Sequence, residues 1–446
     1  MARRAREDDP ADPVAWCRSR FSGLFRDSGP VTLRPHDPRV AIWAGTVAHA
    51  DRHSQAEPLA VGGAGFSDRD AELAGIGEAI ERWQTHRLDR DQVIRSRFTD
   101  WHHTRPGTAG IPAVDPDRWV LFHDEQYDQP GFPFEPLDAE TEVDWVGFRQ
   151  ATTGEACWVP AELAFMDLRP GVAPPRFAPA VSTGWSAHGS PDLALLRGVQ
   201  EVIERDAVMA AWWGRYPLRE HRPADIWAAL PPWLAARVQR RNLDYRFYRI
   251  ESPYSAHVTM VTVTGEDREG HCFSIGSACR EAREASFSKA LVEAVQGRHF
   301  VRYWLPRMKH AATPVPTTFR EHALWYSLAP GRLADTVLAR AEPADSGTAD
   351  RASSAVATHE PAMEPLATLV DRLGPERPVL VRLMTPPALA SPGAGHGGES
   401  GWVVVRVMIP GLQPLHGDHR LPFLGGPAWG DRAISSWAAM PPHPFA

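Results

Sequence analysis

Apolar residues recur at helical spacing in three stretches of this chain, and each stretch carries the same polar interruption. Helices are therefore predicted over residues 68–87, 191–214 and 280–300. Each contains two long polar residues three positions apart; the pairs are Glu78 and Glu81, Glu201 and Glu204, and Glu293 and Gln296. Because positions i and i+3 share one face of a helix, each pair is expected to point in a single direction.

Shorter stretches alternate between apolar and polar residues, or are rich in β-branched residues, and predict strands. The expected strands lie within residues 29–57 (Val31 and Leu33, Val40 and Ile42) and at 119–123, 143–148, 157–159, 245–250, 256–263, 379–383 and 403–409. A further helix is expected over 366–373. Long helices, short strands and many turns predict an α+β fold, in which the helices carrying the Glu-x-x-Glu pairs pack on mainly antiparallel sheets.

A lone Glu-x-x-Glu-Arg sequence on a helix is most often a solvated face with local ion pairs. Here the surrounding residues are too apolar for such a face; they include Leu73, Ile76, Ile80, Leu196, Val199, Val202 and Ile203. Carboxylates gathered in an apolar setting repel one another unless cations lie among them. Mg²⁺ prefers oxygen ligands and most often arrives with nucleotide phosphates, so the pattern predicts a metal-ligand cluster.

The composition argues against nucleic-acid-binding, membrane and secreted proteins. A formal charge of −7 gives no general affinity for nucleic acid or for a membrane surface. No apolar run reaches the roughly 20 residues of a membrane-spanning helix, and no apolar stretch follows the basic N-terminus as it would in a secretory signal. The four cysteines form no Cys-x-x-Cys pair, so neither a zinc site nor a disulfide framework is expected, and a reducing cytoplasm is the expected location.

Several motifs resemble those of the YcaO family, and together they extend from about residue 58 to the end of the chain. The segments that carry the resemblance are Gly63-Ala-Gly-Phe-Ser67 with Glu78-Ala-Ile-Glu-Arg82, Ser182-Thr-Gly-Trp-Ser-Ala-His-Gly-Ser190 with Glu201-Val-Ile-Glu-Arg-Asp-Ala207, Ala290-Leu-Val-Glu-Ala-Val-Gln296, Ile409-Pro-Gly-Leu-Gln-Pro-Leu-His416, and Pro442-His-Pro-Phe-Ala446. The resemblance implies an enzyme that binds ATP and Mg²⁺ and activates a backbone amide oxygen of a peptide. The usual products are thiazoline or oxazoline rings, and thioamides and macroamidines are rarer ones.

The chain departs from the family pattern at three places. Many members have Lys where this chain has Ala64, Ser where it has Ala74, and Gly-Asn where it has His188 and Gly189. Two interpretations therefore stay open: a divergent, active cyclodehydratase, or a weakly catalytic or non-catalytic partner subunit in a peptide-maturation complex. A different ATP-dependent ligase or kinase is disfavoured because residues 62–65 do not form a P-loop.

The resemblance and the carboxylate pattern together suggest roles for the site residues. Amide oxygens are poor leaving groups, and phosphoryl transfer from ATP to that oxygen would allow elimination to an azoline, so the enzyme mainly positions groups and neutralises charge. The expected Mg²⁺ ligands are Glu78, Glu81, Glu201 and Glu204. The expected nucleotide-binding residues are Arg82, Arg205, Glu293, Gln296 and Arg298. The alternative role for each Arg is an ion pair with its own helix, and for Glu293 and Gln296 it is helix packing.

The chain ends in an alternating proline sequence, Pro442, His443, Pro444, Phe445 and Ala446. Azoline-forming relatives often end in Pro-x-Pro-x-Pro, and here the last Pro is replaced by Ala446. Alternating prolines stiffen an extended segment, so the tail is expected to reach the active site, where His443 or the terminal carboxylate would transfer protons. The alternative is an unstructured terminus.

The expected organisation is an N-terminal arm with the first strands over 1–57 and a YcaO domain over 58–446. That domain would contain a flexible insertion at about 340–364, a Gly- and Pro-rich loop at 386–401, and the tail at 441–446. Residues 1–57 contain no obvious leader-peptide-binding module. The expected partners are therefore a precursor peptide and a separate leader-binding protein of the E1-like (ThiF-like) type, while a homodimer is left open.

Overall fold

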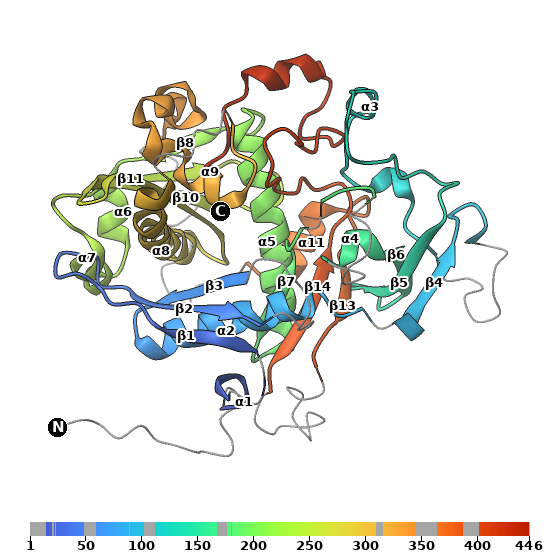
Figure 1. Ribbon diagram of the computed structural model, residues 1–446, viewed down its shortest axis with the longest axis horizontal. Coiled ribbons are helices and arrows are strands. Elements are labelled where there is room, and N and C mark those ends of the chain that lie inside the picture. The colour runs from blue at the N-terminus through green and yellow to red at the C-terminus, as the bar shows by residue number, and fades with distance from the viewer. Residues whose placement is uncertain are drawn as a thin grey trace.

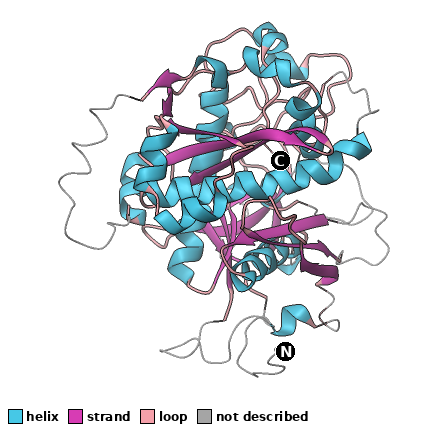
Figure 2. Ribbon diagram, turned by 90° about the vertical axis from the view of Figure 1, so that its left-hand side faces the viewer, coloured by secondary structure: helices cyan, strands magenta, loops and turns pink. Residues whose placement is uncertain are grey.

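Three β-sheets surround a long central helix, α5 (Pro191–Trp212), in the computed structural model (Figure 1). The structure describes residues 15–19, 22, 24–48, 59–88, 90–101, 112–166, 176–179, 181–308, 315–344, 364–386 and 401–445. Figure 2, turned by 90° from the first view, shows strands in two separate levels with helices lying across them. This arrangement lets α5 bury residues on almost all of its faces, including Val199, Ile203, Val208 and Met209.

The first sheet is antiparallel and consists of β1 (Phe25–Pro30), β2 (Ala41–Val47) and β3 (Leu59–Gly65). The short helix α1 (Ala15–Arg18) precedes it. Helix α2 (Asp68–Gln84) follows β3 directly and packs on β2 and β3. The side chain of Ser67 accepts a hydrogen bond from the Asp70 N–H and caps the start of α2.

The second sheet has the strand order β11-β10-β9-β8-β12, and only the short β12–β8 pair is parallel. Its strands are β8 (Leu218–His221), β9 (Asp244–Ile250), β10 (Val258–Asp267), β11 (Gly270–Cys279) and β12 (Glu342–Pro343). Helix α8 (Arg283–Met308) lies along β10 and β11 and also reaches β3. The neighbouring helices are α6 (Pro223–Ala229), α7 (Pro232–Val238) and α9 (Phe319–Leu328).

The third sheet has the order β4-β5-β13-β14-β7, with β6 paired to β5, and these described strands pair antiparallel; Ala113 adds an isolated parallel bridge to Trp158. Its strands are β4 (Val93–Ser96), β5 (Val143–Gln150), β6 (Ala156–Pro160), β7 (Trp185–His188), β13 (Leu380–Leu383) and β14 (Val403–Met408). Helix α4 (Ala161–Ala164) packs on β5 and β6, and α11 (Leu366–Leu373) contacts α5. A further short helix is α3 (Asp124–Tyr127). Short 3₁₀ helices occur at Arg90–Gln92, Pro116–Arg118, Pro330–Asp335, Val337–Arg340 and Ile434–Ala439.

The helices that carry the polar pairs join these sheets to one another. Helix α5 contacts β7 and β14 of the third sheet and β11 of the second. Helix α2 contacts β7 as well as its own sheet, and α8 contacts β3. The three helices therefore meet where the three sheets adjoin. Their polar pairs are expected to lie in this region.

The predicted α+β fold with mainly antiparallel sheets is confirmed, and most predicted elements are present. Ser190 caps α5 and Pro191 occupies its first position, with the Ser190 side chain accepting from the Leu193 N–H. The predicted helix 366–373 is found, and the predicted strands at 143–148 and 157–159 form a hairpin.

Two strand predictions are wrong. Residues 31–33 form no strand, because β1 ends at Pro30. Residues 119–123 are also not a strand: Val120, Leu121 and Phe122 are all buried, and Phe122 stacks on Phe134 and Phe423. These consecutive apolar side chains are buried by packing against other aromatic rings, and not by pairing of their backbone in a sheet. Residues 345–363 and 387–400, which contain most of the two predicted loops, lie outside the described residues.

Candidate active site

Helices α2, α5 and α8 bring the predicted polar pairs into one electrostatically linked cluster. The charge of Glu201 on α5 acts on Glu81 on α2, and the charge of Glu204 acts on Glu201. Arg205 on α5 interacts with Glu293 on α8. Sequence positions more than two hundred residues apart therefore share one site, which we call the carboxylate cluster: Glu78, Glu81, Glu201, Glu204 and Glu293.

Glycines in β3 allow the helices to approach the strand closely enough to form this cluster. A Cβ atom at Gly63 would lie 2.1 Å from the Ala71 carbonyl oxygen and 2.2 Å from the Gly75 nitrogen, both in the backbone of α2. A Cβ atom at Gly62 would lie 2.8 Å from Gln296 Nε2 on α8. A residue with a side chain at Gly63 would therefore push α2 away from the strand.

Backbone N–H groups fix the orientation of three of the carboxylates. The N–H of Gly62 donates to Glu78 Oε2 at 2.9 Å, the N–H of Ala187 donates to Glu81 Oε1 at 2.6 Å, and the N–H of Gly184 donates to Glu201 Oε2 at 3.2 Å. In each case one oxygen is held by the backbone. The second oxygen of each carboxylate is then available to a cation.

Glu204 is anchored more firmly than the other carboxylates. Its side chain is 5% exposed, accepts from the Ser277 hydroxyl at 2.6 Å and accepts from the Cys279 N–H at 3.1 Å. Glu78 and Glu201, by contrast, keep 32% and 30% of their side-chain surface exposed. A ligand entering the site therefore meets Glu78 and Glu201 first, with Glu204 behind them.

The cluster carries more negative charge than its own cations neutralise. Burial raises the pKa of Glu81 well above its ordinary value, and the charges of Glu201 and Glu78 raise it further. Burial also raises the pKa of Glu201, against the opposing effect of Arg205. Carboxylates that repel one another in this way are stabilised by added divalent cations, which supports the metal-ligand interpretation.

Three cationic side chains border the carboxylates. Arg82 lies 3.6 Å from Glu78, and Arg205 lies 3.9 Å from Glu201 and 3.8 Å from Glu204. Lys289 lies 3.1 Å from Glu293, one turn along α8. The Arg contacts are long for ion pairs, so these guanidinium groups keep hydrogen-bonding capacity for an anionic ligand.

Lys289 is a site residue that the sequence analysis did not identify. Its only sequence signal was that Lys289 and Lys309 are the two lysines of the chain. Ala64, which stands where many family members have Lys, packs instead against the apolar cluster that contains Phe287 and Ala290. The structure thus places a lysine on α8 near β3 rather than on β3 itself.

The structure does not bring Arg298 into the carboxylate cluster, and its expected role in nucleotide binding stays a prediction. Its side chain is 4% exposed and pairs with Asp267 at 3.3 Å, beside the Arg302 pairs with Asp37 and Asp267. Glu293 and Gln296 lie on the face of α8 that meets the carboxylate cluster and β3. Arg298 follows Gln296 by two residues, a rotation of about 200° around the helix, so it faces the opposite side.

The C-terminal segment is ordered and buried through Phe445, whereas Ala446 lies outside the described residues. Tyr326 donates to the Pro442 carbonyl at 2.5 Å, and Phe445 packs edge-on against Trp212 at the end of α5. His443 Nε2 donates to the His416 carbonyl at 2.7 Å, and the Phe445 N–H makes a longer contact of 3.3 Å with His443 Nδ1. His443 therefore holds the tail in place, and its role in proton transfer, like that of Pro442, Pro444 and Ala446, stays a prediction.

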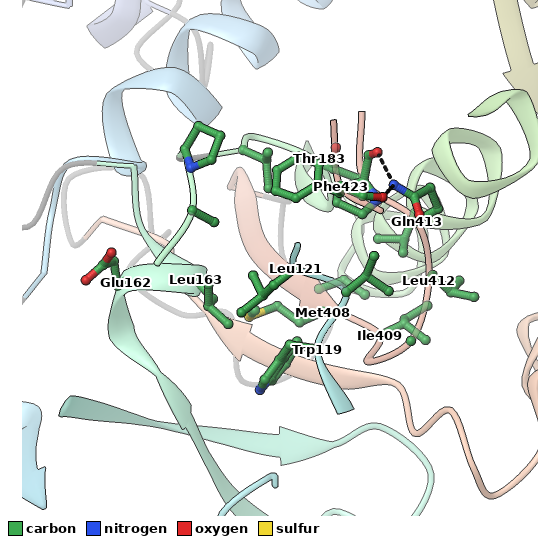
Figure 3. Close-up of a pocket in the computed structure, with 18 of the residues that line it drawn as sticks. Trp119, Leu121, Glu162, Leu163, Thr183, Met408, Ile409, Leu412, Gln413 and Phe423 are labelled. Atoms are coloured by element: carbon green, nitrogen blue, oxygen red, sulfur yellow. Dashed lines mark hydrogen bonds between the residues drawn. The ribbon is translucent and has the colours of Figure 1, made fainter. Parts of the chain in front are cut away.

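An apolar pocket adjoins the carboxylate cluster (Figure 3). Trp119, Leu121, Leu163, Met408 and Ile409 gather around it, while the labelled Glu162 points away from them. Arg406 and Thr183 also line it. Burial lowers the pKa of Arg406 to about 10, and the negative charge of Glu201 partly opposes this effect. Arg406 therefore lies near Glu201, and the pocket is a neighbour of the carboxylate cluster.

Comparison with known proteins agrees with this geometry. A family model described as YcaO cyclodehydratase, ATP- and Mg²⁺-binding, matches residues 62–413. The chain belongs to the YcaO family. ATP and Mg²⁺ are the cofactors of YcaO cyclodehydratases, and the enzyme type expected from the sequence is confirmed at this level. The matched region contains all five members of the carboxylate cluster, with a donor set of oxygens that suits Mg²⁺.

Solved structures of other YcaO proteins and heterocyclases share the fold at low sequence identity. A heterocyclase in complex with substrate and cofactor has a TM-score of 0.67 and 16% identity, over 95% of this chain and 55% of that one. YcaO from Methanopyrus kandleri, bound with AMPPCP and Mg²⁺, has a TM-score of 0.52 and 19% identity, over 88% of this chain and 87% of that one.

A third solved structure is the Escherichia coli microcin synthetase McbBCD complex, with a TM-score of 0.57 and 14% identity over 94% of this chain and 96% of that one. The chain thus spans about half of the first heterocyclase but nearly all of the matched microcin synthetase chain. No curated protein matches the sequence. Among the described residues, no helix has both the length and the apolar character needed to cross a membrane.

Proposed function

We propose that this protein uses ATP and Mg²⁺ to activate backbone amides of a ribosomally made precursor peptide and converts Cys, Ser or Thr residues to thiazoline or oxazoline. The observation that carries the proposal is the carboxylate cluster on α2, α5 and α8, in which burial raises the pKa of Glu81 and Glu201 and neighbouring carboxylates raise both pKa values further. A structural role alone would favour apolar residues or fully paired charges at such positions. A site that binds metal ions and a triphosphate explains why these helices carry more carboxylates than their own cationic side chains can pair with.

Each cluster residue has a role that follows from its environment. Glu78, Glu81, Glu201 and Glu204 would hold Mg²⁺, with Glu204 orienting the site through its two protein hydrogen bonds. Arg82, Arg205 and Lys289 would bind phosphate oxygens, and Glu293 and Gln296 would position the nucleotide from α8. When bound, ATP would supply the phosphoryl group that turns the amide oxygen into a leaving group.

The apolar pocket lined by Trp119, Leu121 and Met408 supports a peptide substrate. It lies next to Arg406, which donates to the carbonyl oxygens of Thr183 and Leu163 and so fixes the loop before β7. An apolar side chain of the peptide bound here would lie beside Glu201. Remote binding of this kind positions the reacting amide without contributing to the chemistry itself.

Known complexes support the proposed partners. Solved neighbours include a heterocyclase with substrate and cofactor, and the McbBCD complex with pro-MccB17 bound. By analogy, a precursor peptide and a separate leader-binding protein of the E1-like type would act with this chain, and a homodimer is an alternative assembly. The four cysteines are all free and buried, which supports our placement of the protein in the cytoplasm.

A second candidate function is a binding partner without catalysis. Ala64 and Ala74 favour it, because both replace polar groups of the family pattern. The contact between Lys289 and Glu293 favours an active enzyme, because it supplies a lysine to the same site from another element. Thioamide or macroamidine formation would use the same ATP site with a different nucleophile.

Calorimetry and mass spectrometry together test the proposal. ATP is titrated with and without Mg²⁺, and the protein is then incubated with ATP, Mg²⁺, a precursor peptide from a neighbouring gene and the cognate leader-binding protein. We expect Mg²⁺-dependent ATP binding and the loss of one water per ring.

Glu78→Gln and Glu204→Gln should abolish ATP consumption while the protein stays folded. ATP binding without any peptide modification would favour the partner role, and exchange of oxygen for sulfur would identify a thioamide product.

A further inference from the structure

Three histidines from distant segments meet at a second site, away from the carboxylate cluster. His322 lies on α9, His416 lies in the loop that follows β14, and His443 lies in the C-terminal segment, whose end Figure 1 marks beside α9. One ring nitrogen of each lies within 4.8 Å of the others. The three residues are 0%, 1% and 1% exposed, so the meeting point is sealed from solvent.

Backbone carbonyls determine the tautomers of two of these rings. His322 Nδ1 lies 2.6 Å from the His443 carbonyl oxygen, and His443 Nε2 lies 2.7 Å from the His416 carbonyl oxygen. A carbonyl only accepts, so each of these nitrogens carries the proton. His322 Nε2 and His443 Nδ1 are therefore lone-pair nitrogens. Metal-binding histidines have this same pattern, in which the second ring N–H donates to a carbonyl.

The remaining nitrogens lack adequate partners. His322 Nε2 and both ring nitrogens of His416 are buried and make no hydrogen bond. His443 Nδ1 has only the 3.3 Å contact from the Phe445 N–H. Buried polar atoms are almost always satisfied in proteins, so three such nitrogens on two adjoining rings point to a missing ligand between them.

We propose that His322, His416 and His443 bind Zn²⁺ at a structural site that fastens the C-terminal segment to α9. An all-imidazole donor set suits Zn²⁺ among common cellular ions and does not suit Mg²⁺. Zn–N bonds of about 2.0–2.1 Å place tetrahedral ligands roughly 3.4 Å apart, so the rings draw together when the ion binds. Burial lowers the pKa of all three imidazoles, which keeps them in the neutral form that binds metal.

His419 is the nearest source of a fourth ligand. Its ring centre lies 6.0 Å from that of His416 and 6.2 Å from that of His322. Its Nδ1 is buried without a partner, and the ring also makes a hydrogen bond with the Met440 backbone. Four protein ligands would make the site a closed, structural one.

The position of the three histidines connects the C-terminal segment to helix α5. His443 is followed by Phe445, which packs on Trp212 at the end of α5, the helix that carries Glu201 and Glu204. An ion bound to His322, His416 and His443 would join α9, the loop after β14 and the chain end. Its removal should loosen the tail before it affects ATP binding.

Metal content and Co²⁺ spectroscopy test this site directly, without ATP or peptide. The full chain is purified, loaded with Zn²⁺ or Co²⁺, and dialysed. We expect close to one Zn²⁺ per chain and the visible absorption of tetrahedral Co²⁺. His416→Gln is the informative variant, because it removes a ligand whose ring makes no described hydrogen bond, and it should weaken Zn²⁺ binding at least ~10-fold. His271→Gln, at a histidine paired with Glu266 outside this site, is the matched control and should bind Zn²⁺ normally.

Hydrogen exchange provides a second readout. A chelator selective for zinc should speed amide exchange over residues 440–445 in the wild-type protein and have no effect on His416→Gln. Wild-type protein that retains no Zn²⁺ and shows no tetrahedral Co²⁺ spectrum would overturn the proposal, whatever the variants do. Equal Zn²⁺ content in wild type and a folded His416→Gln variant would also overturn it.

Discussion

Glu81 shows how a single side chain can be both unfavourable for the apo protein and needed for its ligand. Its half-buried carboxylate accepts a hydrogen bond from the Ala187 N–H at 2.6 Å, while desolvation, and then the charges of Glu201 and Glu78, raise its pKa. Its negative charge is therefore disfavoured until cations arrive. Groups with strongly shifted pKa values are common at functional sites, where an arrangement that binds a ligand can lower the stability of the unliganded protein.

The first prediction follows from this environment. Glu81→Gln keeps the hydrogen bond to Ala187 and removes the repulsion, so the melting temperature should stay equal or rise. Mg²⁺-dependent ATP affinity should fall at least ~10-fold, or about 1.4 kcal/mol, when measured by calorimetry. Glu72→Gln is the matched control on the same helix, because Glu72 pairs with Arg18 away from the cluster and should leave ATP affinity unchanged. Normal affinity in Glu81→Gln would remove Glu81 from the ligand set.

Lys289 tests whether a cation from α8 serves the site. Lys289→Met should weaken ATP binding at least ~10-fold, since a phosphate loses one cationic contact and Glu293 loses its partner. Arg307→Gln removes a positive charge from the same helix at a residue that contacts the Tyr303 carbonyl, and should have little effect. Equal losses in both variants would indicate a general charge effect rather than a specific contact.

Asp206 gives a prediction about pH. It is 3% exposed, accepts from the Gln413 N–H at 2.8 Å, and burial raises its pKa to about 6. The unfolded chain ionises Asp206 more readily, so the stability associated with this group is complete below about pH 4 and is lost as the pH rises through 6. Asp206→Asn keeps the acceptor for Gln413 and should raise the melting temperature at pH 8 but not at pH 4. An equal shift at both pH values would contradict the assignment.

At the scale of elements, the contact between β3 and α2 decides where the carboxylates lie. Gly63→Ala places a Cβ atom 2.1 Å from the Ala71 carbonyl, so α2 must move. We expect a loss of about 1–3 kcal/mol in the free energy of unfolding, measured by denaturant titration, together with weaker ATP binding. Gly29→Ala is the control in the same sheet, because nothing lies within 4 Å of its added Cβ atom. A neutral Gly63→Ala variant would show that the strand and helix are less closely packed than described.

Helix α5 links the active site to the rest of the molecule at this scale. Its middle carries Glu201 and Glu204, and its end packs through Trp212 on the C-terminal segment. A long helix with nearly all faces buried transmits packing changes along its length. Trp212 thus places the C-terminal segment against the end of the helix that carries Glu201 and Glu204.

At the scale of the whole molecule, the prediction concerns the chain end. A tag added after Ala446 leaves the Tyr326 and His322 hydrogen bonds to the tail intact but displaces the terminal carboxylate. Cyclisation should fall at least ~100-fold, with ATP affinity within about threefold of wild type. Deleting residues 442–446 should also lower the melting temperature, because Phe445 leaves Trp212. An N-terminal tag is the control, and normal cyclisation by the C-terminally tagged protein would limit the tail to a structural role.

Local periodicity made the helices and their polar pairs predictable. The spacing of Glu201 and Glu204 sets their shared direction, and Ser190 with Pro191 sets where α5 begins, because both effects act within a few residues. The same reasoning places Arg298 on another face of α8 than Gln296, since a side chain two residues further on faces the other side of the helix. The strand error at 119–123 arose because consecutive apolar residues also suit a buried loop in an aromatic cluster.

The helices, the carboxylate pairs, the mainly antiparallel α+β class and the YcaO family were all predictable from the sequence, because each depends on local spacing or on motif residues. The packing of distant segments was needed to bring Glu293 on α8 near Arg205 on α5, to bury the tail, and to bring His322, His416 and His443 together. These residues come from separate segments, and only the packing of α8 on β3 and of the tail on α9 brings them together. Proximity between distant segments depends on the sum of many weak contacts, which no local pattern encodes.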